Sequence, residues 1–201
     1  MSGLVGAGLL LLVLAAAYVR IAVVLEVLRS AIGAGVPPRS VMALLALTLA
    51  AFVMLPVVET ALPAGAALPS GEGEALLAVA TAAREPLREF LDRRTPAAER
   101  QSLLELARRL RPLERRDAVD GKDLSVLAPA FVLAELKAAF SIGFLLFLPF
   151  LVLELLVAVV LTTLGMHALD PRAVALPFKL LLFVAADGWH LIGRGLILGY
   201  T

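Results

Sequence analysis

Two long apolar runs separated by a short polar turn make up residues 129–201. Gly165 ends the first run, and glycine readily takes the left-handed conformation found at many helix C-termini. Asp170 and Pro171 open the second run as an N-cap and a first helical residue, a position where proline sacrifices no hydrogen bond. The pattern predicts a helical hairpin, with a first helix over about residues 130–164 and a second helix that begins after Asp170.

Charged side chains interrupt these apolar runs. They are Glu135, Lys137, Glu154, Lys179 and Asp187. Ionisable groups are costly in hydrocarbon, so they face protein, water or one another and commonly mark a functional interior. Glu135 and Lys137 lie two positions apart, about 200° around a helix, and cannot pair with each other on one helix face. Their partners are expected on a neighbouring copy of the chain, with Glu135 meeting Lys137 of the next copy, or on Lys179 or Asp187 of the same chain.

Two prolines, Pro149 and Pro177, lie within the apolar runs. Proline removes a hydrogen bond from a helix and clashes with the preceding turn, so we expect a break at each position. In a membrane such breaks persist where other protein satisfies the freed backbone groups. The expected fold class is an all-α membrane protein with two helical hairpins of broken, charge-bearing helices and a polar helical loop between them.

Composition supports the assignment to a membrane. Of the 201 residues, 61% are hydrophobic and the mean hydropathy is +0.94, well above the roughly one-half apolar content of soluble domains. Charge is concentrated in residues 63–128, which hold 11 of the 18 Lys and Arg and 11 of the 17 Asp and Glu. This balance leaves no broad basic surface for nucleic acid. The absence of cysteine excludes disulfides and thiolate metal sites.

The segment before this polar region, residues 1–62, is predicted to form the other hairpin. Its apolar runs cover about residues 4–29 and 40–58, with a glycine- and proline-rich turn between them. The second run holds 19 uncharged residues, roughly 28 Å of helix, which matches one hydrocarbon thickness. The N-terminal stretch lacks a positive n-region, so we expect a retained first helix rather than a cleaved signal peptide.

The polar loop, residues 63–128, is expected to lie in the periplasm together with both termini. The short loops carry arginine, which the positive-inside rule places in the cytoplasm. Within the polar loop, the patterns predict helices over about residues 74–91 and 96–110. Thr95 is the predicted N-cap of the later helix and Pro96 its first residue.

The chain shows no catalytic constellation. Its two histidines, His167 and His190, have no histidine at i+4, and there is no cysteine nucleophile, GxSxG elbow or HExxH motif. We therefore expect neither enzymatic activity nor a bound metal or cofactor. Two other interpretations are a small-solute transporter built from broken helices, which would show internal repeats that we do not find, and a structural membrane adaptor without a pore.

Several motifs occur in a characteristic order along the chain. They are RIAVVLEVLRSAIG (20–33), EPLREFLDRRT (85–95), PAFVLAELKAAFSIGF (129–144) and LPFKLLLFVAADGWHL (176–191). The chain thereby resembles the FliP/SctR family, the inner-membrane export-gate subunits of flagella and of type III secretion injectisomes. The resemblance implies a pore-forming subunit that passes unfolded polypeptides across the bacterial inner membrane, within a secretion-system basal body. Flagellar members usually carry an additional leader, which favours the injectisome branch here, with a flagellar export gate as the alternative.

The same resemblance implies a set of partners. A ring of five copies, in contact with membrane lipid, would assemble with SctS/FliQ-like and SctT/FliR-like small subunits, and then with SctU/FlhB-like and SctV/FlhA-like proteins. The charges expected to hold the copies together are Glu135, Lys137, Lys179 and Asp187. The residues that match the family's packing motif are Pro177, Phe178, Gly188 and Trp189.

Pore closure is a further implication of the resemblance. Family members carry a methionine-rich run after the glycine that ends the third hydrophobic segment, and soft methionine side chains suit a deformable seal. Here Met166 and His167 follow that glycine. Met166 would then form the seal, and His167 would either titrate near neutral pH or be a solvated turn residue. Phe140 and Phe144 are candidates for residues near the lumen.

Overall fold

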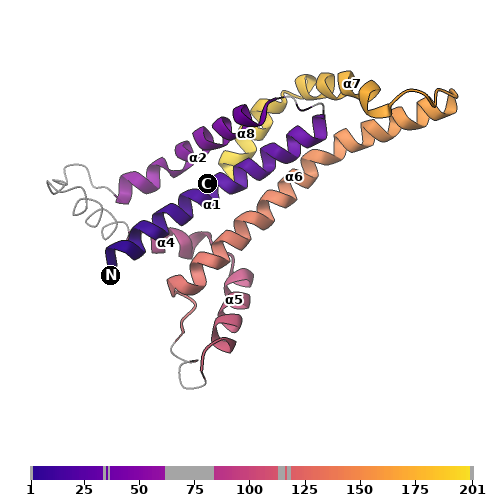
Figure 1. Cartoon of the computed structure of the whole chain (residues 1–201). Coiled ribbons are helices and arrows are strands. Elements are labelled where there is room, and N and C mark those ends of the chain that lie inside the picture. Colours follow the sequence, from indigo (N-terminus) through magenta and orange to yellow (C-terminus); the bar gives the residue numbers. More distant parts are fainter. Residues whose placement is uncertain are drawn as a thin grey trace. The chain divides into compact units, whose positions relative to one another are not determined.

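The computed structural model describes residues 2–33, 35, 37–61, 84–112, 116 and 119–199. Helices form the regular secondary structure, and no strand occurs in these described ranges (Figure 1). The helices are α1 (Ser2–Ile32), α2 (Arg39–Ala61), α4 (Arg84–Arg94), α5 (Ala97–Arg109), α6 (Leu124–Thr163), α7 (Pro171–Ala185) and α8 (Gly188–Leu198). The predicted all-α membrane fold is confirmed.

Two helices in the described part of the chain are long and apolar enough to cross a membrane. One is α2, over Arg39–Pro56, and the other is α6, over its full 40 residues. Helices α7 and α8 would add a third span if they cross as one bent pair, because they are bent by 61° at the short break between them. The apolar runs that predicted a membrane protein are therefore helical.

The residues group into two compact units. The first unit comprises residues 1–19 and 51–137, and the second comprises residues 20–50 and 138–201. The first unit therefore contains α4, α5 and the start of α6, whereas the second contains the rest of α6 together with α7 and α8. The predicted division into hairpin, polar loop and hairpin concerns order along the chain and stays a prediction.

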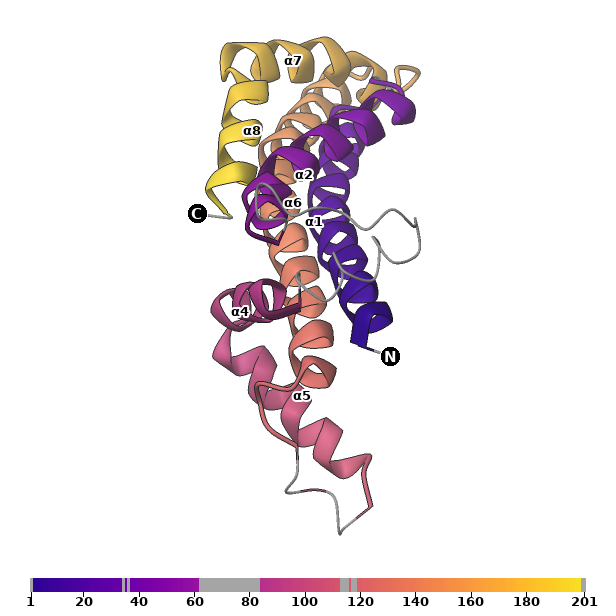
Figure 2. The ribbon, with the colours of Figure 1, turned by 90° about the vertical axis from the view of Figure 1, so that its left-hand side faces the viewer.

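In the first unit, α4 packs on the beginning of α6 (Figure 2). Leu87 and Leu91 lie one turn apart on α4 and are fully buried, as expected for an amphipathic helix with a single apolar face. Phe90 meets the buried Phe131 of α6 edge-on, with ring centroids 5.8 Å apart. Helix α4 is the described end of the helix predicted over 74–91, and the earlier residues of that prediction lie outside the described ranges.

The start of α5 differs from the prediction. The helix begins at Ala97 with Pro96 as its N-cap, and no side chain caps it. The hydroxyl of Thr95 instead donates to the carbonyl of Leu91 at 2.7 Å. This bond orients the hydroxyl towards the carbonyls of the preceding helix instead of the amides at the start of α5. The predicted N-cap at Thr95, with Pro96 as first helical residue, is therefore wrong by one position.

In the second unit, α6 ends as the sequence predicts. Gly165 has a φ of +73°, and its amide donates to the carbonyl of Thr162 at 3.1 Å. The Met166 amide donates to the carbonyl of Leu161 at 2.9 Å. These two bonds form a Schellman motif, which satisfies carbonyls that the helix end would leave without partners.

The start of α7 also follows the prediction. The side chain of Asp170 accepts a hydrogen bond of 3.0 Å from the amide of Arg172, and Pro171 is the first helical residue. The cap satisfies one of the amides at the helix N-terminus, and proline contributes a pre-set φ. Both predicted corners of the C-terminal hairpin are therefore confirmed.

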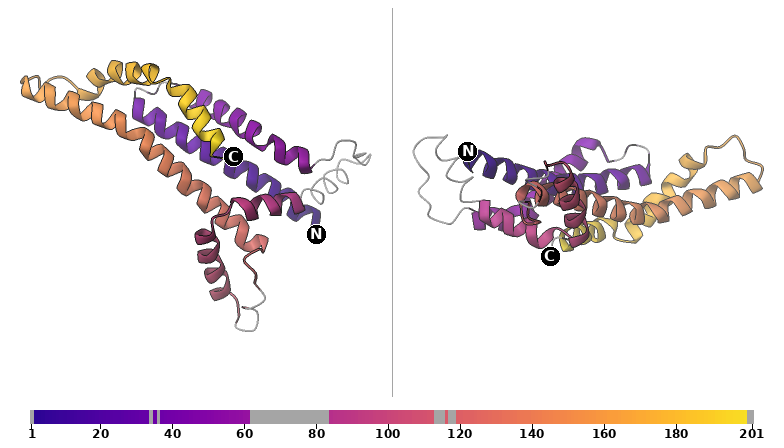
Figure 3. Two further views of the ribbon diagram at one scale, coloured as in Figure 1. Left: turned by 180° about the vertical axis from the view of Figure 1, so that it is seen from behind. Right: turned by 90° about the horizontal axis from the view of Figure 1, so that it is seen from below.

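The prolines do not interrupt the helices. Helix α6 continues through Pro149, and α7 continues through Pro177. The break lies between α7 and α8, where Asp187 has a φ of +48°, and Figure 3 shows α8 turning away from α7 at this point. The predicted breaks at Pro149 and Pro177 are wrong because a helix can absorb the loss of one hydrogen bond. A left-handed residue, by contrast, redirects the chain.

Candidate functional site

Lys179 lies on the buried face of α7. Ala175, Lys179 and Phe183 recur every four residues and are the buried residues of this helix. This spacing places all three on one side of α7. Lys179 is only 5% exposed, so its ammonium group needs partners within the protein.

Two oxygen atoms accept hydrogen bonds from Nζ of Lys179. One is Oε2 of Glu154 in α6, at 2.6 Å, and the other is the carbonyl oxygen of Ala31, at 2.9 Å. Ala31 lies in the last turn of α1, where carbonyls lack helical partners and attract a cation. Oε1 of Glu154 also lies 3.3 Å from Nε of Arg172. This Lys179 cluster, formed by Lys179, Glu154, Arg172 and Ala31, ties α7 to α6 and to the end of α1.

Sequence reasoning recognised Glu154 as a charge in an apolar run but did not pair it with Lys179. A signal was present, because the two residues lie at nearly equal distances along the chain from the α6–α7 turn. Residues placed in this way become neighbours when two helices run antiparallel. The contact with Ala31 could not be predicted in this way, because Lys179 binds its backbone carbonyl, a group that every residue has.

Lys137 and Glu135 face different environments at the start of α6, as their spacing predicts. The side chain of Lys137 is 73% exposed, and its Nζ donates to Oε1 of Glu99 in α5 at 2.8 Å. Glu135 is buried. The hydrogen bond from Lys137 lowers the pKa of the Glu99 carboxyl below its ordinary value. This pair connects α5 to α6 within the first unit, and Glu99 is a partner that sequence reasoning did not name.

The segment around Asp187 is organised by aromatic packing. Gly188 is buried against Phe183, because a Cβ added at this glycine would overlap the Phe183 ring. Trp189 meets the same ring edge-on, with centroids 5.1 Å apart and planes at 89°. Asp187 itself is exposed, with Oδ2 3.6 Å from Nδ1 of His190. Gly188 and Trp189 thus lie together, as a packing motif requires.

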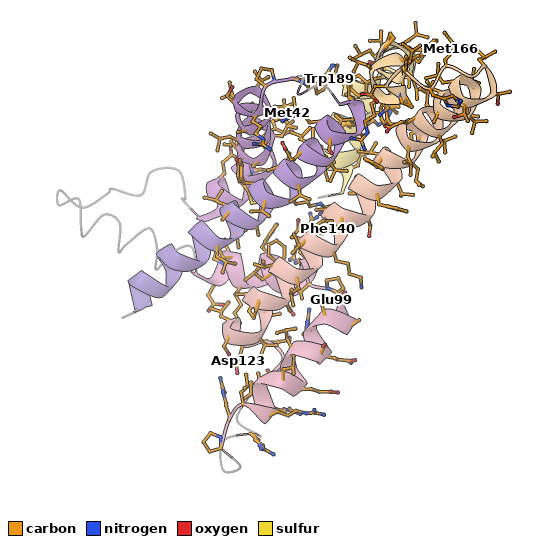
Figure 4. The ribbon with its side chains drawn as sticks, turned by 45° about the vertical axis from the view of Figure 1, so that its right-hand side comes forward. Met42, Glu99, Asp123, Phe140, Met166 and Trp189 are labelled. Atoms are coloured by element: carbon orange, nitrogen blue, oxygen red, sulfur yellow. The ribbon has the colours of Figure 1, made fainter. Side chains whose placement is uncertain are left out.

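The predicted pore-closure residues are exposed. Met166 and His167 lie in the α6–α7 turn, and Phe140 and Phe144 lie one turn apart on α6. Figure 4 places Met166 at the tip of the hairpin and Phe140 well away from it along α6. The second unit therefore presents these residues as two separate exposed groups.

A wide apolar surface surrounds the Lys179 cluster. Only 11% of an apolar 18-residue window of α6 is buried within the chain. Pro177 and Phe178 of the predicted packing motif are exposed on α7. Other large apolar side chains exposed on the second unit include Leu145, Leu155, Leu156, Val159, Val160, Leu164, Leu181, Val184 and Leu191. An exposed apolar surface of this kind is covered by lipid or by another protein.

Comparison with known proteins identifies the family. The model of the FliP family matches residues 4–196. This match covers almost the whole chain and includes every residue of the Lys179 cluster. The chain belongs to the FliP family. Among the described residues of this FliP-family chain, no group of three or more histidine, aspartate or glutamate side chains could hold a metal ion.

Relatives come from both kinds of type III secretion machinery. The chain is 42% identical to the hypersensitivity response secretion protein HrcR of Ralstonia nicotianae over 188 residues, which is 91% of this chain and 87% of that protein. It is 36% identical to the Yop proteins translocation protein R of Yersinia pestis over 195 residues, 95% and 89% of the two chains. It is 40% identical to the flagellar biosynthetic protein FliP of Caulobacter vibrioides over 188 residues, 93% and 69%.

These findings confirm the prediction of a type III secretion export-gate subunit. The protein is a membrane component of the secretion apparatus, where it works with other components. The FliP family is a structural part of the export gate and is not known as an enzyme family.

Proposed function

We propose that this chain forms the pore of the export gate and passes unfolded polypeptides across the bacterial inner membrane. The observation that carries the proposal is the uncovered length of α6. Its 40 residues rise roughly 60 Å, twice the roughly 30 Å hydrocarbon core of a bilayer. Because only nine of these 40 residues are buried within the chain, lipid covers about half of the helix and neighbouring protein covers the rest.

A ring of five copies would supply that neighbouring protein. We assign packing between copies to Glu135, Lys137, Lys179 and Asp187. Lys137 and Asp187 are exposed and reach a neighbour directly. Glu135 and Lys179 are buried and shape the helix faces that the neighbour meets. The predicted packing residues Pro177, Phe178, Gly188 and Trp189 complete this contact.

In this proposal the α6–α7 turn closes the pore. Met166 and His167 are exposed there, and an unbranched methionine can seal against a passing polypeptide and still deform. Phe140 and Phe144 approach the lumen from α6, since both are exposed and stand one turn apart. The ring would assemble with SctS/FliQ-like and SctT/FliR-like small subunits and then with SctU/FlhB-like and SctV/FlhA-like proteins. Relatives from both branches make this a proposal for an export gate of either kind.

Native mass spectrometry of the detergent-purified chain tests the ring. The chain is expressed alone and then together with SctS-like and SctT-like small subunits. The expected result is a discrete homo-oligomer that captures the small subunits. A chain that stays monomeric in both settings overturns the ring.

A photo-crosslinking residue tests the pore. It is introduced at Phe140 and, as a matched control, at Leu106, which is also exposed but lies on α5 in the first unit. An export substrate arrested during transport should crosslink at Phe140 and not at Leu106. Equal crosslinking at both positions, or crosslinking at neither, contradicts the assignment of Phe140 to the lumen.

A further inference from the structure

The second unit contains a groove whose lining is almost entirely apolar. Its volume is about 590 Å³. It lies between the end of α1, the first turns of α2, and α8, and its lining includes Leu25, Met42, Leu45, Leu49, Trp189 and Gly193. Figure 4 shows Met42 and Trp189 close to each other where α2 and α8 approach. We propose that this groove holds one acyl chain of a membrane phospholipid, with the lipid headgroup at the Arg39 end.

The helix that contributes the largest share of the lining is itself long and apolar enough to cross a membrane. Helix α2 is a candidate membrane span over Arg39–Pro56, and only 22% of that span is buried within the chain. Within a membrane, an apolar groove along such a helix is not exposed to water. The apolar molecules around the helix therefore fill the groove. In a membrane those molecules are acyl chains.

The length of the groove agrees with one membrane leaflet. Its lining residues on α2 and the preceding turn run from Pro37 to Leu49, which corresponds to roughly 18 Å at 1.5 Å per residue. Half of a hydrocarbon core is roughly 15 Å thick. A single acyl chain that starts at the membrane surface therefore spans the groove from one end to the other.

The charge at the Pro37 end fits a phosphate group. Arg39 begins α2 two residues after Pro37, and its side chain is 79% exposed. Arg29 and Arg39 outnumber Glu26, whose carboxylate they flank at 3.7 and 3.4 Å. Basic residues at the end of a span attract anionic headgroups. Trp189 is partly exposed in the groove lining, and tryptophan is typical of the interface between hydrocarbon and headgroups.

Trp189 makes the proposal measurable because it is the single tryptophan of the chain. The purified full-length chain in detergent micelles is titrated with a phospholipid that carries bromine atoms on its acyl chains, which quench tryptophan fluorescence on contact. Phosphatidylglycerol and phosphatidylcholine are the two lipids used. We expect quenching that saturates near one lipid per chain for both lipids. Quenching that rises without saturation in proportion to the lipid in the micelle overturns the proposal.

Two glycines of α8 provide a matched pair of variants. Gly193 lines the groove and Gly195 does not, and a Cβ added at either meets nothing within 4 Å. Gly193→Leu should abolish the saturable quenching because its side chain occupies the groove. Gly195→Leu makes the same change in composition and helix propensity and should preserve the quenching. Equal quenching in both variants contradicts the groove as the binding site.

If Gly193→Leu does not fold, Arg39→Gln provides a second test of the lipid site. Arg39 is exposed, so this substitution should not prevent folding. One basic side chain near a membrane surface contributes enough for about fivefold in affinity for an anionic headgroup. We therefore expect phosphatidylglycerol to bind about fivefold more weakly, with phosphatidylcholine nearly unchanged. If neither lipid changes, the headgroup is not at Arg39. If saturable quenching is confined to monomeric fractions and oligomers show none, the groove belongs to the contact between copies, and the lipid proposal fails.

Discussion

Removing the members of the Lys179 cluster one at a time should destabilise the chain unequally. Glu154→Leu leaves the Lys179 ammonium group with the Ala31 carbonyl as its remaining partner in the cluster. Breaking a buried ion pair in this way costs about 3–5 kcal/mol. The Glu154 side chain is 27% exposed, so water partly screens the pair, and we expect a loss near the lower bound, about 3 kcal/mol.

Lys179→Met should cost less. Glu154 keeps Arg172 at 3.3 Å and has access to water, so no charge is left buried without a partner. The methionine also replaces the apolar stem of the lysine with a side chain of similar volume. We expect a loss of about 1 kcal/mol, the net value of the hydrogen bonds removed. The double variant should lie within about 1 kcal/mol of the native chain, because replacing both ions by apolar residues is often nearly neutral.

The measurement is the free energy of unfolding of the detergent-solubilised chain, obtained by titration with a denaturing detergent and followed by circular dichroism. Arg194→Met serves as the control, since Arg194 is an exposed arginine of α8 whose loss should change stability little. If Lys179→Met destabilises as much as Glu154→Leu, the role of Arg172 as a second partner is wrong. If the two single losses add in the double variant, Lys179 and Glu154 are not coupled.

Three further predictions concern single contacts. Gly165→Ala should cost about 1–2 kcal/mol in thermal unfolding, because a side chain is strained at a φ of +73°. Gly188→Ala should cost about 1–3 kcal/mol because the added methyl overlaps the Phe183 ring. The stabilising contribution of the Glu99–Lys137 pair should be present at neutral pH and be lost as the pH falls through the lowered pKa of Glu99, so native and Lys137→Gln chains should converge in melting temperature at low pH.

Each of these predictions has a direct check. Phe183→Leu combined with Gly188→Ala should recover part of the lost stability, whereas no recovery would show that the ring is not the obstacle. Gly165→Asn should cost less than Gly165→Ala because asparagine tolerates the left-handed conformation better, and the reverse order would contradict the Schellman assignment. A constant difference between native and Lys137→Gln chains at every pH would show that Glu99 is not the titrating partner.

Local chemistry determined which features of the fold could be predicted from sequence. The corners at Gly165 and at Asp170 depend on residues within one helical turn, and both predictions were confirmed. The prediction for the start of α5 failed because a threonine hydroxyl can either accept from an amide of the following helix or donate to a carbonyl of the preceding one, and Thr95 donates to the carbonyl of Leu91. The break at Asp187 was not predicted because only proline was considered as a residue that breaks a helix, whereas this break is made by a non-proline residue in the left-handed conformation.

Contacts between distant segments were largely beyond sequence reasoning. The burial of Lys179 against Ala31 depends on where α1 ends relative to α7, and no residue pattern encodes that relation. The partner of Lys137 is Glu99, which lies 38 positions away on a different helix. The groove lined by Leu25, Met42 and Trp189 draws on three separate helices, none of which carries a recognisable binding motif.

Three features of the second unit depend on one another. The Lys179 cluster positions α7, the break at Asp187 sets the direction of α8, and α8 forms one wall of the groove. Lys179 holds α7 to the last turn of α1, so the end of α7 has a defined position. The left-handed Asp187 and the close approach of Gly188 to Phe183 then direct α8 back along α1 and α2, where Gly199 lies against the guanidinium of Arg20. Only because α8 returns along this path does Trp189 form one wall of the groove. A substitution that displaces α8, such as Gly188→Ala, should therefore weaken lipid quenching of Trp189 even though Gly188 does not line the groove.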